Sequence, residues 1–361
     1  MKTISVMKSP LFLLLSLLLM STISLNAQEL ARVDSLENEL EYSRDHVQQV
    51  HILLALAESF RDSDTTRAKI YLEEIHRLSG EKAYSGGLAL YYNELGRMRA
   101  YHGDFRNAIQ LYDRAMKHYL LSQNDTGYCH AMVNQGNAHL YLAEYKKALQ
   151  QYETALEIFE SIENSRGASR CLNNMGIIYK NYGQYDKALQ TYKRVVAIDS
   201  ALGNRPSLHH AYINIGNVYL LLGQYDLAID YYDRAFRVSK TSGNRKEMAR
   251  ALHSKGVIQK KLSQYEQALK YNQKALELSR SINDKIGESL SLNNIGTTYI
   301  DMGEFSLARE YIEAALEIKK ELGDPRAISN AYNYLAHIHH EQSDYDSALI
   351  LNEMALSLKR E

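Results

Sequence analysis

Apolar and small residues recur along the chain at spacings that indicate α-helices. Tyr212, Ile215, Gly216 and Tyr219 lie at positions i, i+3, i+4 and i+7, which places them on one face of a helix. A second stripe of tyrosine and alanine follows over residues 225–235, again with helical spacing. The pattern therefore predicts two amphipathic helices in succession, each of which buries one side.

The helix pair repeats every forty residues without an insertion. The small residue of the first helix recurs at Gly96, Gly136, Gly176, Gly216, Gly256, Gly296 and Ala336. An aromatic residue stands nine positions later, at Phe105, Tyr145, Tyr185, Tyr225, Tyr265, Phe305 and Tyr345. Alanine stands twelve positions later, at Ala108, Ala148, Ala188, Ala228, Ala268, Ala308 and Ala348. Residues 85–361 are therefore predicted to form seven regular units.

Glycine and Asx residues are predicted to mark the ends of these helices. Gly183 and Gly223 stand where a first helix should end, because glycine adopts the left-handed conformation that terminates helices. N-caps are expected at the start of each unit, at Asn124, Asn164, Asn204, Asn244, Asp284 and Asp324. Asn244 and Glu247 have capping-box spacing, and Pro325 occupies a first-turn position where proline is tolerated.

The composition agrees with an all-α fold. The 361 residues include only 3 Pro and no Trp, against 28 Tyr, and few prolines mean few enforced helix breaks. Gly176 and Ala188 are small enough for two helices to approach closely, and Tyr185 and Tyr192 are expected to fill the space between helices. A single helix pair cannot bury both of its faces, so neighbouring pairs must stack. We predict an α-solenoid superhelix of stacked antiparallel helix pairs.

Residues 1–27 have the pattern of a secretory signal peptide. Lys2 and Lys8 precede an apolar run of about ten residues, and Ala27 offers a small residue for cleavage. The run is short for a membrane span, and an uncleaved anchor is the alternative. We therefore expect an extracytoplasmic protein, periplasmic or secreted, with no membrane span after cleavage.

Two segments separate the signal peptide from the regular units. Residues 28–48 are expected to form an N-terminal capping helix. The apolar side of this helix is marked by Leu30, Val33, Leu36 and Leu40. Residues 49–84 form a degenerate copy of the repeat, in which Leu56 replaces the glycine while Ala68 and Ile75 fall in register.

Few groups in the chain point to catalysis. The sequence contains no Gly-rich phosphate loop and no His-Glu-x-x-His, Cys-x-x-Cys or Gly-x-Ser-x-Gly motif, so we predict no enzyme and no cofactor. His337 and His340 are spaced to share a metal ion, but His339 falls in the aromatic column, and we predict no metal site.

Cys129 and Cys171 are expected to be small buried residues, with a disulfide between them as the alternative. The formal net charge of −1 gives no general attraction to nucleic acid.

The columns of the repeat together resemble the tetratricopeptide repeat. The resemblance rests on the glycine, on an aromatic residue three positions later, and on the pattern Gly-x-Tyr-x-x-Ala-x-x-x-Tyr-x-x-Ala. That aromatic residue is present at Tyr179, Tyr219 and Tyr299. The usual unit has about 34 residues, whereas this sequence resembles a longer forty-residue subtype over residues 50–360. Polar departures from the pattern occur at Arg99, His139, Gln259, His339, Gln135 and Lys255.

The order of a signal peptide, a leading helix and repeats is similar to the extracytoplasmic sensor regions of bacterial tetratricopeptide histidine kinases and related regulators. Those proteins continue into a membrane span and a signalling domain. No such segment follows in this sequence.

In this family the first helix of each unit lines the concave wall, so the resemblance implies binding residues on that face. Asparagine recurs there two positions before the glycine and one position after it. An asparagine amide both donates and accepts hydrogen bonds, and related repeats hold a peptide backbone in this way. The predicted peptide-binding residues are Asn134, Asn137, Asn174, Asn214, Asn217, Asn294, Arg170 and Arg250. The alternative is that the amides bridge neighbouring helices.

Two further features bear on partners. The same wall is expected to carry positive charge, which favours an acidic partner or a carboxylate. The basic residues are Arg170, Arg250, Lys180, Lys260 and Lys261. A solvated charged face is the alternative. The last helix keeps apolar residues at Ile350, Leu351, Leu356 and Leu358, which is compatible with self-association through the C-terminal repeat.

We therefore expect a non-enzymatic scaffold that binds a protein or an extended peptide in a concave groove. The alternative is the sensor module of a bacterial signal-transduction system whose output domain is absent or supplied by a partner.

Overall fold

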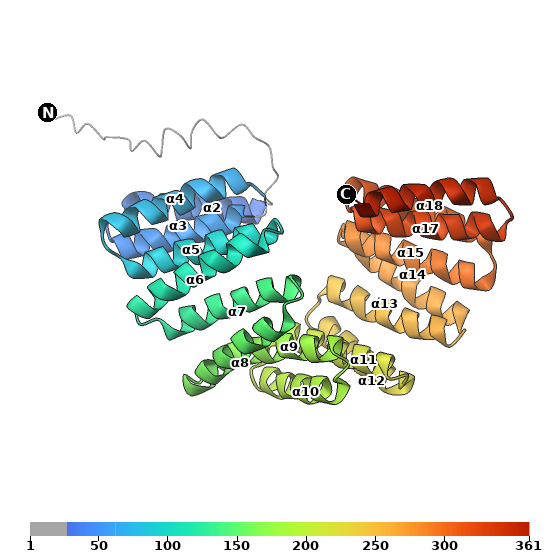
Figure 1. The fold of residues 1–361 in the computed structure, drawn as a ribbon, viewed down its shortest axis with the longest axis horizontal. Helices are drawn as coiled ribbons and strands as arrows, with labels where there is room; N and C mark the ends of the chain where they lie inside the picture. Colours follow the sequence, from blue (N-terminus) through green and yellow to red (C-terminus); the bar gives the residue numbers. More distant parts are fainter. Residues whose placement is uncertain (1–26, 62, 361) are drawn as a thin grey trace. The chain divides into compact units, whose positions relative to one another are not determined.

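The computed structural model describes residues 27–61 and 63–360, and it confirms an all-α fold. Over these residues the chain forms seventeen helices and no strand, and consecutive helices pack as antiparallel neighbours within each compact unit (Figure 1). The predicted signal peptide lies outside the described residues, apart from Ala27. No described helix is both long enough and apolar enough to cross a membrane.

The chain divides into two compact units, Met1–Ile162 and Glu163–Glu361. The helices of unit 1 are α2 (Ala27–Tyr42), α3 (His46–Phe60), α4 (Thr65–Glu81), α5 (Ser85–Tyr101), α6 (Phe105–Leu121), α7 (Asp125–Tyr141) and α8 (Tyr145–Ser161). The helices of unit 2 are α9 (Ser165–Asn181), α10 (Tyr185–Ala201), α11 (Arg205–Leu221), α12 (Tyr225–Thr241), α13 (Arg245–Lys261), α14 (Tyr265–Ser281), α15 (Lys285–Met302), α16 (Phe305–Leu322), α17 (Pro325–Glu341) and α18 (Tyr345–Arg360). Two regular repeats therefore lie in unit 1 and five in unit 2.

The leading helix is shorter than the sequence suggested. α2 ends at Tyr42 and α3 begins at His46, because Asp45 caps α3 by accepting from the Val47 N–H at 3.1 Å. Val33 is buried and Leu36 and Leu40 pack against the core beside it. Leu30 is 52% exposed, so it does not belong to the buried side that we expected.

A turn with a left-handed residue separates consecutive helices every twenty residues from position 83 to position 343. Gly183 and Gly223 have φ values of 70° and 72°, as the sequence predicted. Half of these turn positions carry a side chain, at Ala83, Gln123, Ala143, Glu163, Ser263, Asn283 and Ser343. The tight turn is therefore fixed by the packing of the helices, and glycine is not obligatory.

Four of the six predicted N-caps form. Asn124, Asn164, Asn244 and Asp324 accept hydrogen bonds from backbone N–H groups in the first turn of the next helix. Asn204 and Asp284 do not cap with their side chains, so these two predictions are wrong.

The failure at Asn204 has a structural cause. Pro206 removes one backbone N–H that a cap would bind, and the Asn204 amide donates to Asp199 at 3.0 Å instead. At Asp284, the carboxylate lies 4.0 Å from Lys246 Nζ.

The glycine column makes room for a buried ring of the second helix. A Cβ atom on Gly136 would lie 2.6 Å from a ring carbon of Tyr152, and one on Gly216 would lie 2.5 Å from a ring carbon of Tyr232. The side chain sixteen positions after the glycine therefore fills the space that the missing side chain leaves. Gly96 and Gly176 receive Tyr112 and Tyr192 in the same way, and all four tyrosines are buried.

Candidate functional site

A cavity in unit 1 has a volume of about 500 Å³, and its lining combines polar with aromatic side chains. Its wall is formed by Arg61 at the end of α3, by residues of α5, α6 and α7, and by the turn at Gly103. The lining side chains include Arg61, Arg97, Asn134, Asn137, Tyr101, Phe105, Tyr112 and Tyr141. Two predicted binding residues, Asn134 and Asn137, therefore share one cavity with two guanidinium groups.

A buried carboxylate holds the two arginines of the cavity. Glu94 is buried and accepts from Arg61 Nη1 at 3.0 Å and from Arg97 Nη1 at 2.8 Å. Arg97 Nη1 also lies 3.1 Å from the partly exposed carboxylate of Glu58. Glu94 stands two positions before Gly96, where four of the six later units have asparagine, so an ion-pair network replaces the asparagine in the first regular unit.

The two asparagines of the cavity are held by different partners. Asn134 Nδ2 donates to Asn93 Oδ1 at 3.1 Å, which links α7 to α5. The Tyr152 hydroxyl donates to Asn137 Oδ1 at 2.7 Å, which links α8 to α7. Helical geometry places Asn134 and Asn137 three residues apart on one face, on either side of the close contact at Gly136.

The same bonds recur in unit 2 at the same register. Asn214 Nδ2 donates to Asn173 Oδ1 at 3.0 Å, and the Tyr232 hydroxyl donates to Asn217 Oδ1 at 2.7 Å. Burial raises the pKa of Tyr232, so its hydroxyl remains a donor at neutral pH. Asn174 Oδ1 lies 3.5 Å from Asn173 Nδ2, at the limit of a hydrogen bond.

Helix bridging, the alternative role for the asparagines, is thus present in both units. Asn294 is half-buried, and its side chain forms no hydrogen bond with the residues that the structure describes.

Several of the predicted basic residues of unit 2 lie close to carboxylates. Arg170 is exposed, and Arg250 Nη1 lies 3.3 Å from Glu247 Oε1. Lys260 Nζ lies 3.2 Å from Asp301 Oδ2. Burial lowers the pKa of Lys180, which is half-buried. Carboxylates therefore offset part of the positive charge that the sequence indicated.

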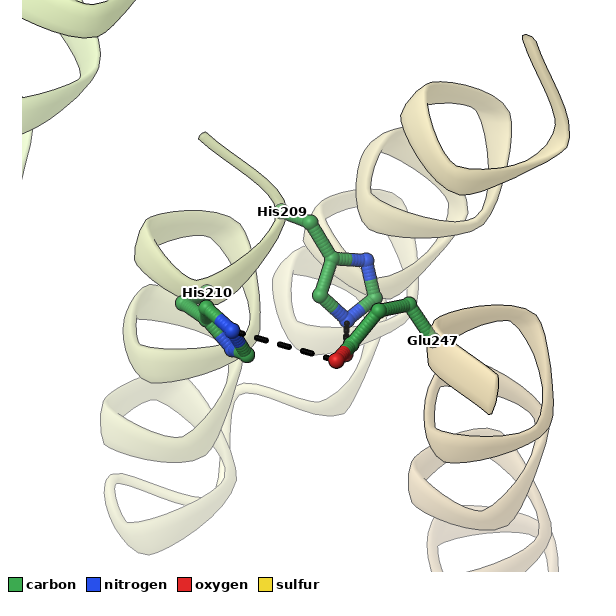
Figure 2. Close-up of side chains that lie close together, drawn as sticks. All are labelled: His209, His210 and Glu247. Atoms are coloured by element: carbon green, nitrogen blue, oxygen red, sulfur yellow. Dashed lines mark ion pairs between the residues drawn. The ribbon is translucent and has the colours of Figure 1, made fainter. Parts of the chain in front are cut away.

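One cluster of groups that can hold a metal ion was missed by the sequence reasoning. Among the described residues, such a cluster forms at His209 and His210 on α11 and Glu247 on α13 (Figure 2). The pair that the sequence singled out, His337 and His340, shares only the exposed Glu341, at 3.7 Å and 3.5 Å. The missed cluster joins residues from two successive repeats, so no local sequence motif indicates it. A shift of forty residues does align the region of Glu247 with that of the two histidines.

The two cysteines are buried side chains, as expected. Burial raises the pKa of the Cys129 thiol to about 11, so the thiol stays protonated at neutral pH.

Helix α18 of unit 2 carries an exposed apolar surface. Ile350 is 58% exposed, and Leu349, Met354 and Leu356 are also exposed. Leu351, by contrast, packs against the buried cluster of Ala308, Ile312 and their neighbours, so it is not part of the exposed face.

These stacked helix pairs, with a small residue in the first helix opposite a large one in the second, define an α-solenoid repeat protein. A family model of the tetratricopeptide repeat matches residues 127–201, 207–281 and 288–361. The chain therefore belongs to the tetratricopeptide repeat family.

Several solved structures share this fold. The apo form of the quorum sensor NprR from B. thuringiensis is 17% identical with a TM-score of 0.69, and the match covers 92% of this chain and 94% of that chain. Aspartyl phosphate phosphatase F from Bacillus subtilis is 13% identical with a TM-score of 0.65, and the match covers 95% and 96%.

A third solved structure is only partly covered. A Signal Transduction ATPase with Numerous Domains from Pyrococcus horikoshii, which carries a tetratricopeptide repeat sensor, is 17% identical with a TM-score of 0.61. That match covers 93% of this chain and 53% of that chain, so this chain spans about half its length. At these identities the similarity shows the fold alone. No curated protein matches the chain in sequence.

Proposed function

We propose that the protein binds an extended peptide, or an extended segment of a protein, without changing it chemically, and that the cavity of unit 1 anchors this ligand. The observation that carries the proposal is the shared lining of Arg61, Arg97, Asn134 and Asn137. Guanidinium and amide groups provide the donors and acceptors that a peptide backbone and a carboxylate require.

Arg97 is held in place while part of its guanidinium remains available. Both of its carboxylate contacts, to Glu58 and Glu94, use Nη1. Its Nε and Nη2 groups have no partner among the described residues. A ligand carbonyl or carboxylate oxygen can accept from them, and for this reason we propose a ligand with an acidic group at this position.

Asn134 combines a structural bond with a vacant acceptor. Its Nδ2 is occupied by Asn93, but its Oδ1 accepts no hydrogen bond from the residues that the structure describes. Bridging and binding are therefore compatible in one side chain, because the bridge fixes the amide while its oxygen can accept from a peptide N–H.

Aromatic side chains border the polar groups of the cavity. Phe105 and Tyr141 stack with their ring centroids 4.8 Å apart, and Tyr141 and Tyr101 are exposed. Such rings provide apolar contact area at low cost in side-chain entropy. We therefore expect the ligand to carry an apolar side chain close to its acidic group.

Selection from a random peptide library displayed on phage tests the proposal with the full chain as bait. An enriched peptide is then titrated against the parent, Asn134→Ala and Asn214→Ala. The latter removes the matched bridge in unit 2, away from this cavity. Asn134→Ala should weaken binding by about 1–3 kcal/mol, because one hydrogen bond is lost in a desolvated site. Asn214→Ala should bind the peptide as the parent does. Equal affinities for all three proteins would contradict the proposal.

A sensor role is the second candidate, and the extent of the match to the quorum sensor NprR favours it. In a sensor, the bound peptide must stabilise one conformation over another. Small-angle scattering of the full chain with and without the enriched peptide tests this role. A change in the radius of gyration on binding supports a sensor, and an unchanged value supports a static scaffold.

We also propose that the protein acts outside the cytoplasm, on the basis of the signal-peptide pattern in residues 1–27. A fusion of the chain to alkaline phosphatase, which is active only after export, should be active in a bacterial host. N-terminal sequencing of the exported protein should begin at Gln28. An inactive fusion that retains Met1 would contradict this location.

A further inference from the structure

His209, His210 and Glu247 converge on one point in unit 2 (Figure 2). The histidines are adjacent on α11, and Glu247 lies in the first turn of α13, in the next repeat. One ligand atom from each residue lies within 4.8 Å of the other two. This cluster lies in unit 2 and does not depend on the function proposed for the cavity of unit 1.

The buried histidine of the cluster presents one nitrogen to the carboxylate. His209 is 1% exposed, and its Nδ1 lies 3.0 Å from the carbonyl oxygen of Ala235. A carbonyl can only accept, so Nδ1 must carry a proton, and Nε2 is the nitrogen that faces Glu247. A backbone carbonyl that fixes one nitrogen while the other faces an ion is the usual arrangement of a metal-binding histidine.

The two facing atoms have only each other as partners among the described residues. His209 Nε2 and Glu247 Oε2 lie 2.7 Å apart and are both buried, and they form an ion pair when both imidazole nitrogens carry a proton. Two acceptor atoms at this distance require a proton or a metal ion to bridge them, and a metal ion can take the place of the proton.

His210 is the third residue of the cluster, and the side chain of Glu247 is directed toward it from α13. His210 Nε2 lies 3.8 Å from Glu247 Oε1, and its ring is 46% exposed, so it can turn toward an ion. Glu247 does not reach back to its N-cap; its backbone N–H donates to Asn244 Oδ1 at 3.1 Å, and its carboxylate faces α11. Arg250 competes for Oε1 at 3.3 Å, but its side chain is 52% exposed and can swing away.

We propose that His209, His210 and Glu247 bind a divalent first-row transition-metal ion, for which Zn²⁺ is the best match. Two imidazole nitrogens and one carboxylate oxygen form a ligand set that Zn²⁺ prefers, with a fourth position left for water or another ligand. Bonds of about 2.0–2.2 Å in a tetrahedral site separate the ligand atoms by about 3.3–3.6 Å. One ligand atom from each of the three residues lies within 4.8 Å of the other two, so side-chain rotations are needed to bring all three into this range.

Calorimetric titration of the full chain with ZnCl₂ tests the proposal. The parent should bind one Zn²⁺ per chain at this site, and bound Co²⁺ should give the intense visible absorption of a four-coordinate ion. His210→Ala and Glu247→Gln should each weaken Zn²⁺ binding at least about tenfold. His210 is exposed, so its variant should keep the helical circular dichroism of the parent.

His340→Ala is the matched control, because it removes an exposed imidazole from the other histidine cluster of the same unit. It should bind Zn²⁺ as the parent does. The proposal is overturned if the parent binds no Zn²⁺, if His210→Ala and Glu247→Gln bind it as tightly as the parent, or if His340→Ala loses as much affinity as His210→Ala.

Discussion

At the residue scale, three of the polar residues that interrupt the repeat pattern lie close to a carboxylate five residues further along the chain. His139 Nδ1 lies 2.6 Å from Glu144 Oε2, and His339 Nδ1 lies 2.8 Å from Asp344 Oδ2. Arg99 meets Asp104 at the same separation of five residues, at 3.9 Å. The hydrogen bond from His139 lowers the pKa of Glu144. Each of these polar side chains therefore contacts a carboxylate at the start of the following helix.

Substitution of Gly216 tests the close contact in the glycine column. Gly216→Ala should lower the free energy of unfolding by about 1–3 kcal/mol, because the added Cβ overlaps the buried ring of Tyr232. The ring cannot easily move, since its hydroxyl is bonded to Asn217. Gly80→Ala is the control, because no atom lies within 4 Å of its added Cβ, and it should stabilise α4 by up to about 1 kcal/mol. Equal unfolding midpoints in urea for the two variants would contradict this packing.

His253 should make stability depend on pH. Burial lowers the pKa of His253 from its ordinary value of 6.5 to about 4, while Asn272 and the carboxylate of Asp284 act in the opposite direction. The His253 imidazole is therefore protonated below about pH 6.5 in the unfolded chain, whereas in the folded chain it stays neutral until about pH 4. This contribution to stability is complete above pH 6.5 and is lost as the pH falls toward 4, by on the order of 3 kcal/mol.

Urea unfolding of the parent and of His253→Gln at pH 7 and pH 4.5 measures this contribution. The parent should lose more free energy of unfolding than the variant between the two pH values. Equal losses would show that His253 does not carry the effect.

At the scale of elements, each helix pair is specified by local sequence, while the packing partner decides which surface stays exposed. Within unit 2, α18 packs on α17 and buries Ala348 and Ala355, but it leaves Ile350 and Met354 in solvent. Earlier units have Gln110, Gln150, Gln190, Asp230, Lys270 and Glu310 at the position of Ile350. The apolar face is therefore a property of this one helix.

Self-association is expected at this face, with a second copy of the chain as the partner. Light scattering at micromolar concentration should give a mass above that of the monomer for the parent. Ile350→Lys combined with Met354→Glu should lower the mass toward the monomer, because both side chains are exposed and removing their apolar area leaves the core intact. A monomeric parent, or a variant that associates as the parent does, would contradict this expectation.

At the scale of the whole molecule, the forty-residue register predicted most of the fold because each column has one structural role. The register placed the helix starts from Ser85 to Pro325 and the glycine turns, and it identified the asparagines that recur in both units. It could not predict which atoms of those amides are occupied, since Asn93 and Asn173 lie outside the columns considered. Nor could it predict the contact of His209 with Glu247, which depends on how two neighbouring repeats pack.

The proposed function depends most on the asparagine amides, which we propose hold a peptide by its backbone. The direct measurement is a calorimetric titration of the full chain with an enriched peptide, with a version of the same peptide N-methylated along its backbone, and with a version in which the residues outside the acidic and apolar anchors are scrambled. N-methylation should weaken binding at least about tenfold, because an N-methyl group cannot donate to Asn134 Oδ1, while the scrambled peptide should keep most of its affinity. If N-methylation leaves the affinity unchanged and scrambling abolishes it, the chain recognises side chains, and the claim that its asparagines bind the backbone is wrong.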